Sequence, residues 1–138
     1  MKRQDLWNGA ELLGRLLLGL LFVIEALGKL RGYAGAANYM AAYGVPPFLL
    51  PAAIALEFCA GLMIIAGWRT RVAAFALAGF CFVAALIFHT DFSDSNQAIH
   101  FQKDFALAGA FLVLWARSAG AWSMDAMRSR AVSAEQAR

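Results

Sequence analysis

The chain has 138 residues and a formal net charge of +3, with 62% hydrophobic and only 15% charged residues. Soluble domains are typically about 45–50% apolar and about 25% charged, and a domain of this length exposes too much surface to hide the excess of apolar side chains. Composition therefore favours an integral membrane protein over a soluble one, and the basic residues are too dispersed to support nucleic-acid binding.

The first predicted element is a membrane-spanning helix over about residues 12–30, close to the length that a bilayer requires. It carries Arg15, Glu25 and Lys29, which share one sector of the helix surface with Glu11 at 100° per residue. Because charges inside a membrane are costly, we expect this stripe to face protein, water or a ligand. A cleaved signal peptide is the alternative interpretation, but Arg15 interrupts the apolar run.

A connection over about residues 31–47 follows the first span. It is rich in glycine and ends with Pro46 and Pro47, which break regular structure. Within it, Tyr39 and Tyr43 lie four residues apart, which favours a short amphipathic helix at the membrane interface.

The second and third spans are predicted over about residues 48–68 and 72–88. Glu57 is the single charge of the second span and lies close to its middle, and His89 directly follows the third. Because the polar turn between them is very short, the two spans must be antiparallel neighbours.

A fourth span is predicted over about residues 98–116, after the one sustained polar stretch of the chain. The apolar run at 105–115 is too short to cross a bilayer alone, so the helix must begin earlier. In that case His100, Lys103 and Asp104 share one face, at spacings of three and four residues.

The predicted fold is therefore all-α: an integral membrane bundle of four antiparallel, up-and-down spans within residues 1–126, followed by a flexible polar tail at 127–138. Positive residues near span ends favour the cytoplasm, so both termini are predicted inside and the 31–47 and 89–104 connections outside. The basic residues on the predicted inner side are Lys2, Arg3, Arg69, Arg71, Arg117, Arg128 and Arg130, against Arg31 and Lys103 outside.

This topology gathers most ionisable residues of the spans in the outer half of the bundle. Glu25 and Lys29 are one helical turn apart and can pair within their own helix. Glu57 then needs a partner from elsewhere, for which Arg15, Lys103 or a histidine is available.

We favour a polar pocket that opens to the outer face and binds a small molecule, because intramembrane ionisable residues commonly mark such sites. Glu57 and His89 are its candidate catalytic residues, since neither has a partner in its own helix. The expected substrate-binding residues are Arg15, Glu25, Lys29, His100, Lys103 and Asp104. In the alternative interpretation these charges are structural ion pairs that join the helices.

Other chemistries have weaker support. Cys59 and Cys81 lie alone in apolar runs, so we expect buried apolar residues rather than redox or metal thiols. The histidines and carboxylates suit zinc or iron, but their spacing matches no metal motif, and we predict neither a metal site nor a cofactor held in the chain. No nucleotide-binding or hydrolase motif is present in the sequence.

With these residues laid out, the chain resembles the DoxX family of small bacterial membrane proteins, which is related to SURF4-like proteins. The resemblance covers about residues 10–126 and lies in the order of short features rather than in one motif. These are Arg15, Gly28-Lys29-Leu30, Tyr43-Gly44-Val45-Pro46, Glu57, Gly61, Gly67, Thr70-Arg71, His89, Lys103-Asp104 and Ser123-Met124-Asp125.

The resemblance implies four membrane helices in a bacterial inner membrane and redox chemistry at the quinone pool. Family members include a subunit of a thiosulfate:quinone oxidoreductase, and others are linked to thiol stress or to quinone and catechol resistance. The implied ligand is a quinone, phenolic or sulfur compound, and the implied partners are a redox protein or further copies of the chain. The positions of interest are Arg15, Lys29, Glu57, Arg71, His89, Lys103 and Asp104.

Two functions from different classes stay open at this point. The chain is either a membrane oxidoreductase component or a non-enzymatic membrane subunit or small carrier. The sequence has no flavin or haem motif, which leaves open whether it transfers electrons itself.

Overall fold

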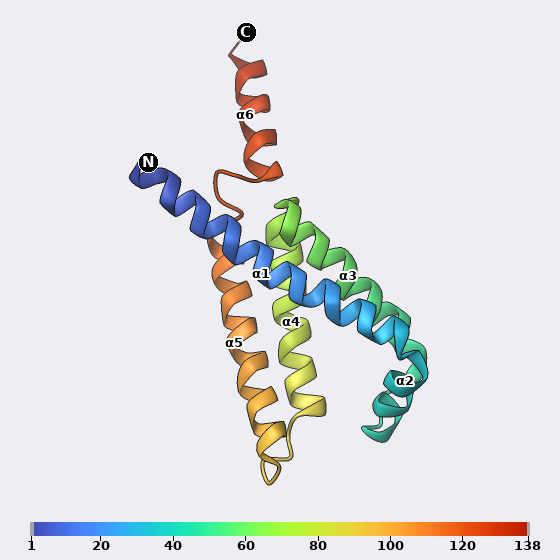
Figure 1. The fold of residues 1–138 in the computed structure, drawn as a ribbon. Helices are drawn as coiled ribbons and strands as arrows, with labels where there is room; N and C mark the ends of the chain where they lie inside the picture. The colour runs from blue at the N-terminus through green and yellow to red at the C-terminus, as the bar shows by residue number, and fades with distance from the viewer. Residues whose placement is uncertain (1, 138) are drawn as a thin grey trace.

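The computed structural model describes residues 2–137, and within this range the fold is all-helical, without strands (Figure 1). Each predicted span lies largely within one long helix, and the short helix predicted between the first two spans is present as α2. The elements are α1 (Arg3–Arg31), α2 (Tyr33–Ala42), a single 3-10 turn η1 (Pro47–Leu49), α3 (Leu50–Ala66), α4 (Thr70–Phe88), α5 (Ser95–Arg117) and α6 (Met124–Gln136).

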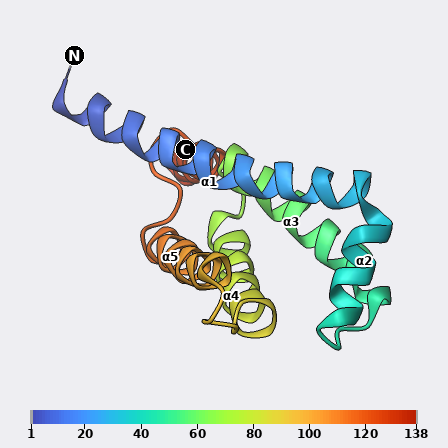
Figure 2. The ribbon, with the colours of Figure 1, turned by 60° about the horizontal axis from the view of Figure 1, so that its bottom comes forward.

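The four long helices form two antiparallel pairs, α1 with α3 and α4 with α5. Figure 2 shows that the α1–α3 pair crosses the α4–α5 pair, so the pairs do not lie alongside each other as in a regular four-helix bundle. The short turn between α3 and α4 joins the two pairs at the end where α6 also lies (Figure 1). We call this the terminal end, and the end with α2 and residues 89–94 the distal end.

A close contact between two glycines fixes the crossing of α1 and α3. A Cβ added to Gly19 would lie 2.6 Å from the carbonyl oxygen of Gly61, and one added to Gly61 would lie 2.9 Å from that of Gly19. Real Cβ atoms do not approach so closely, so only glycine allows this approach. Small residues of this kind let membrane helices pack at short range.

One apolar core joins all four long helices. Phe22 of α1, Ile64 of α3, Leu77 of α4 and Phe111 of α5 are all buried in it. The rings of Phe22 and Phe111 pack edge to face, with centroids 5.3 Å apart. A smaller core at the distal end contains Met40 of α2, which holds α2 against α1 and α3.

Within residues 2–137, two helical segments are long and apolar enough to cross a membrane, Pro47–Ala66 and Thr70–Phe88. The other two predicted spans lie in α1 and α5, which carry more charged residues. Large apolar side chains on the outer faces of the helices are nonetheless exposed, including Leu17 of α1 at 63% and Val113 of α5 at 64%.

The C-terminal segment differs from the predicted tail. It is helical from Met124 to Gln136, because the Ser123 hydroxyl accepts a hydrogen bond from the N–H of Ala126 and Asp125 lies in the first turn. From Arg128 onward the side chains of this helix are exposed.

Candidate functional site

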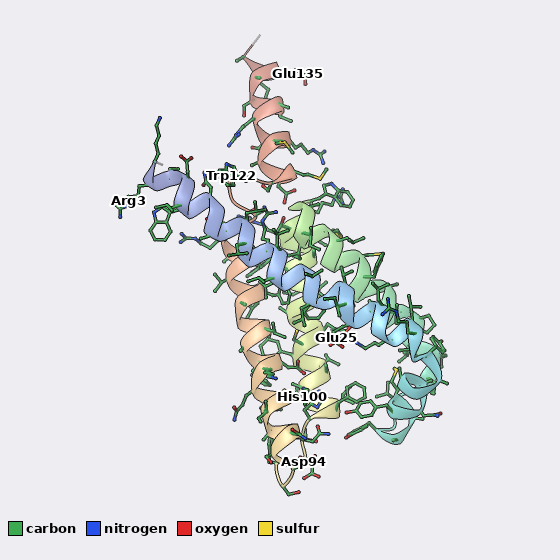
Figure 3. All side chains as sticks on the ribbon, viewed as in Figure 1. Arg3, Glu25, Asp94, His100, Trp122 and Glu135 are labelled. Carbon is green, nitrogen blue, oxygen red and sulfur yellow. The ribbon has the colours of Figure 1, made fainter. Side chains whose placement is uncertain are left out.

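The predicted site residues divide between the two ends of the molecule. Figure 3 shows Glu25 in the distal half of α1 and His100 near the distal end of α5, with Trp122 at the opposite end. Arg15 lies on the terminal half of α1, fourteen residues from Lys29, which corresponds to about 21 Å along a helix. The structure therefore separates Arg15 from the other predicted ligands.

Lys29 joins α1 to α3 through a partly buried ion pair. Its Nζ lies 3.0 Å from Oε1 of Glu57 and 3.4 Å from Oε2 of Glu25. The Glu57 side chain is 3% exposed, whereas that of Glu25 is 57% exposed. The expected partner for Glu57 was Arg15, Lys103 or a histidine, and this expectation is wrong because the α1–α3 crossing places Lys29 directly opposite Glu57.

One oxygen of Glu57 is left without a partner. Its Oε2 is buried and accepts no hydrogen bond, although Oε1 is held by Lys29. An unpaired polar atom in such a place is costly unless water, a proton or a ligand satisfies it. Among the described residues, Nε of Arg15 and the Thr70 hydroxyl oxygen are the other buried side-chain atoms without a hydrogen-bond partner.

The two histidines form a second polar cluster, between the end of α4 and the first half of α5. Their rings stack at 22° with centroids 5.0 Å apart. Nε2 of His89 lies 3.7 Å from Oδ2 of Asp104, and its Nδ1 lies 2.7 Å from Oε1 of Gln97. The prediction that His100 and Asp104 share one face of a helix agrees with this geometry.

Two tyrosines at the end of α2 pack against Phe88, the residue before His89. Tyr39 stacks on Phe88 with centroids 5.5 Å apart, and Tyr43 meets the same ring edge to face at 5.4 Å. The side-chain amide of Gln97 donates a 3.4 Å hydrogen bond to the Tyr43 hydroxyl. Sequence reasoning assigned no role to Gln97, because a single amide in a polar stretch gives no signal.

The two cysteines differ in burial. Cys81 is buried on α4, as predicted, but Cys59 is exposed, contrary to the prediction, because its side chain lies on the outer face of α3. No group of three or more histidine, cysteine or acidic residues that could hold a metal occurs within residues 2–137.

Lys103 belongs to neither cluster. It is exposed on α5 and takes part in no ion pair within the described part of the chain. On a helix, a residue next to Asp104 points about 100° away from it, which explains why only one of the two reaches His89.

Arg15 instead connects backbone segments at the terminal end. Its Nη2 donates to the carbonyl oxygen of Trp122 at 2.5 Å, and its Nη1 lies 3.4 Å from that of Ile64 and 3.5 Å from that of Ile65. Only 2% of Arg15 is exposed. Its guanidinium thus satisfies carbonyls in the last turn of α3 and in the segment that precedes α6.

Asp125 completes this end by capping α4. Its Oδ1 accepts from the N–H of Arg69 at 2.8 Å and its Oδ2 from that of Thr70 at 2.9 Å, while its own N–H donates to the Gly67 carbonyl. Partial burial alone would raise the pKa of Asp125, but the hydrogen bonds from Thr70 and Arg69 and the charge of Arg15 outweigh burial and lower that pKa.

Two cavities also lie at the terminal end, and no predicted substrate-binding or catalytic residue lines either of them. One of about 310 Å³ adjoins the α3–α4 turn, and one of about 370 Å³ lies beside α6. The distal residues Glu57 and His89 are thus brought to neighbouring polar clusters rather than into either of these cavities.

Comparison with known proteins places the chain among bacterial membrane proteins. The DoxX family model matches residues 10–90. The chain is 40% identical to "Inner membrane protein YqjF" of Escherichia coli (strain K12), over 86% of this chain and 92% of that protein. It is 34% identical to "Inner membrane protein YphA" of the same strain, over 83% and 86%.

A shorter match has an oxidoreductase name. The chain is 30% identical to "Putative oxidoreductase CatD" of Bacillus subtilis (strain 168), over 44% of this chain and 46% of that protein. No solved structure matches the chain. The family model covers more than half of the chain, and two relatives match over most of their length, so this chain is a membrane protein of the DoxX family.

Proposed function

We propose that the chain is a bacterial inner-membrane protein whose four long helices all cross the bilayer, with both termini in the cytoplasm. Three observations support this arrangement: two relatives are named inner membrane proteins, α3 and α4 are apolar and long enough, and large apolar side chains are exposed along α1 and α5. In this orientation the distal end faces outward and α2 lies at the outer interface.

We further propose that the outer half binds a small molecule with protonatable oxygens, a quinone or a phenol, as part of a quinone-linked redox or detoxification system. The observation that carries this proposal is the Glu57 carboxylate, which is buried, held by Lys29 on one oxygen and free on the other. A group of this kind can accept or deliver a proton where a ligand oxygen replaces the missing hydrogen bond.

In the proposed reduction of a quinone, residues of this chain transfer the protons and stabilise the developing charge. Reduction of a quinone to a quinol takes up two electrons and two protons. Glu57 delivers protons to the quinone oxygens, His89 and Asp104 resupply them from the outer side, and Lys29 stabilises negative charge on the reduced oxygen. The electrons come from a partner redox protein.

Substitution of Glu57 tests the proposal. Glu57→Gln keeps the shape of the side chain and an oxygen for Lys29 but cannot carry a proton. With an artificial electron donor in place of the partner protein, we expect Glu57→Gln to lose quinone-dependent turnover by about 100-fold or more, the usual contribution of general acid–base catalysis, while Glu25→Gln stays near wild type. Equal quinone binding and turnover in wild type, Glu57→Gln and His89→Ala would refute the redox proposal.

The second candidate function is a non-enzymatic membrane subunit or small carrier, and the Lys29 geometry also favours it. One lysine pairs with carboxylates from two helices, an arrangement that would hold α1 and α3 together without any catalytic role. This candidate predicts that Glu57→Gln lowers stability or assembly with a partner and changes no separate activity. The turnover measurement in folded Glu57→Gln protein therefore distinguishes the two.

A further inference from the structure

A basic cavity at the terminal end lies far from the distal clusters. Its volume is about 310 Å³, and its lining residues come from the α3–α4 turn, the first turn of α4, the segment after α5 and the start of α6. Neither Arg69 nor Arg71 of this lining takes part in an ion pair within residues 2–137. The lining residues are Arg69, Thr70, Arg71, Val72, Ser118 and Asp125.

The single acidic lining residue does not neutralise the two arginines. Both oxygens of Asp125 already accept backbone hydrogen bonds from Arg69 and Thr70, and Arg15 adds its positive charge beside them. Thr70 lies between the two arginines and is completely buried, so contacts to a bound anion fall to Arg69 and Arg71. The cavity thus offers two guanidinium groups, which is the chemistry that binds a phosphate.

An apolar surface continues from the cavity toward the middle of the molecule. Val72 is 62% exposed and Phe75 is 60% exposed, and the Phe75 ring packs against that of Trp115 with centroids 5.8 Å apart. Arg71 and Phe75 are four residues apart, so they share one face of α4. The basic cavity matches the phosphate headgroup of a phospholipid, and the adjacent apolar surface matches its acyl chains. A free phosphate would contact only the cavity.

We propose that this cavity binds the phosphate of an anionic phospholipid of the inner leaflet. Arg69 and Arg71 hold the phosphate oxygens, and the acyl chains cover Val72, Phe75 and Trp115. The proposal rests on the four-span orientation given above and is independent of the redox chemistry.

Quenching of tryptophan fluorescence by brominated lipids tests it when Trp7, Trp68 and Trp122 are replaced by Phe in every protein compared, so that Trp115, which packs against Phe75, is the single reporter. The full chain is reconstituted in phosphatidylcholine vesicles that contain either brominated phosphatidylglycerol or brominated phosphatidylcholine. We expect the wild-type protein to prefer the brominated phosphatidylglycerol. The preference should fall about fivefold in Arg71→Gln and about 25-fold in Arg69→Gln/Arg71→Gln, since fivefold corresponds to about 1 kcal/mol for each direct arginine–phosphate contact that is lost.

Two variants serve as controls. Arg3→Gln/Arg128→Gln removes the same charge from the same end outside the cavity and should keep the preference, and Arg71→Lys should retain most of it. Arg71 is exposed, so its variants are expected to fold, which circular dichroism verifies. The proposal is overturned if wild type shows no preference, if both double variants lose it equally, or if inorganic phosphate displaces the brominated lipid at millimolar concentration.

Discussion

The two ends of the molecule use buried charge in different ways. At the terminal end, Arg15 and Asp125 direct their charges at backbone groups, the carbonyls of Ile64 and Trp122 and the N–H groups of Arg69 and Thr70. At the distal end, charged side chains face one another, and an oxygen of Glu57 stays free. Nε of Arg15 is unpaired as well, so the difference lies in the partners, which are backbone groups at the terminal end and other charged side chains at the distal end.

The comparison also explains why burial alone does not identify a functional residue. Arg15 and Glu57 are equally buried at 2% exposure, and both lie within predicted membrane spans. Their partners differ: Arg15 links three segments of the chain, whereas Glu57 meets only Lys29. Removing the first should therefore unfold the molecule, and changing the second should alter what it does.

Arg15→Met gives the largest expected effect. It leaves the carbonyls of Ile64, Ile65 and Trp122 without their charged donor, and we expect a loss of about 3 kcal/mol or more in the free energy of unfolding. Unfolding in detergent micelles, followed by circular dichroism, measures it. Arg128→Met, at an exposed position on α6, is the control and should change stability by no more than about 0.5 kcal/mol. Equal effects in the two variants would contradict a structural role for Arg15.

Lys29→Met tests the distal end. It removes the cation that faces the buried Glu57 carboxylate, and we expect a loss of about 2 kcal/mol, less than for a fully buried pair because Lys29 is 28% exposed. Adding Glu57→Gln to Lys29→Met should restore most of the stability, since no unpaired charge is then buried. A double variant no more stable than Lys29→Met would mean that the two side chains do not interact.

Asp125→Asn should have a smaller effect that depends on pH. Because its folded-state pKa is lowered, ionised Asp125 stabilises the fold above its ordinary pKa of about 3.9, and this contribution disappears as the pH falls through the folded value. We expect the variant to be about 1 kcal/mol less stable near pH 6, typical of a lost helix cap. The difference in melting temperature should shrink on acidification, and a constant difference would contradict the assignment.

The helices could be predicted from the sequence because apolar runs and their breaks are local features. The turn between α3 and α4 and the shared face of His100 and Asp104 follow from spacing alone. The helix α6 was missed because its polar composition carries no periodic apolar face, and its cap at Ser123 is a single residue.

The partners of the buried charges could not be predicted in the same way. Lys29 meets Glu57 because α1 and α3 cross at Gly19 and Gly61, and the register of a crossing is a property of two helices together. The partners of Arg15 are backbone carbonyls, which every residue has and which the sequence therefore does not mark. The sequence located the ionisable residues, and packing decided which of them share a site.

The most direct test of the account is infrared difference spectroscopy of the protein reconstituted with a quinone, recorded as the quinone is reduced. If Glu57 exchanges protons with the bound quinone, the spectrum of the wild-type protein must contain a carboxyl band that is absent in Glu57→Gln and retained in Glu25→Gln. A spectrum of wild type without that band, or one unchanged in Glu57→Gln, would contradict the proposal that the distal charges serve chemistry.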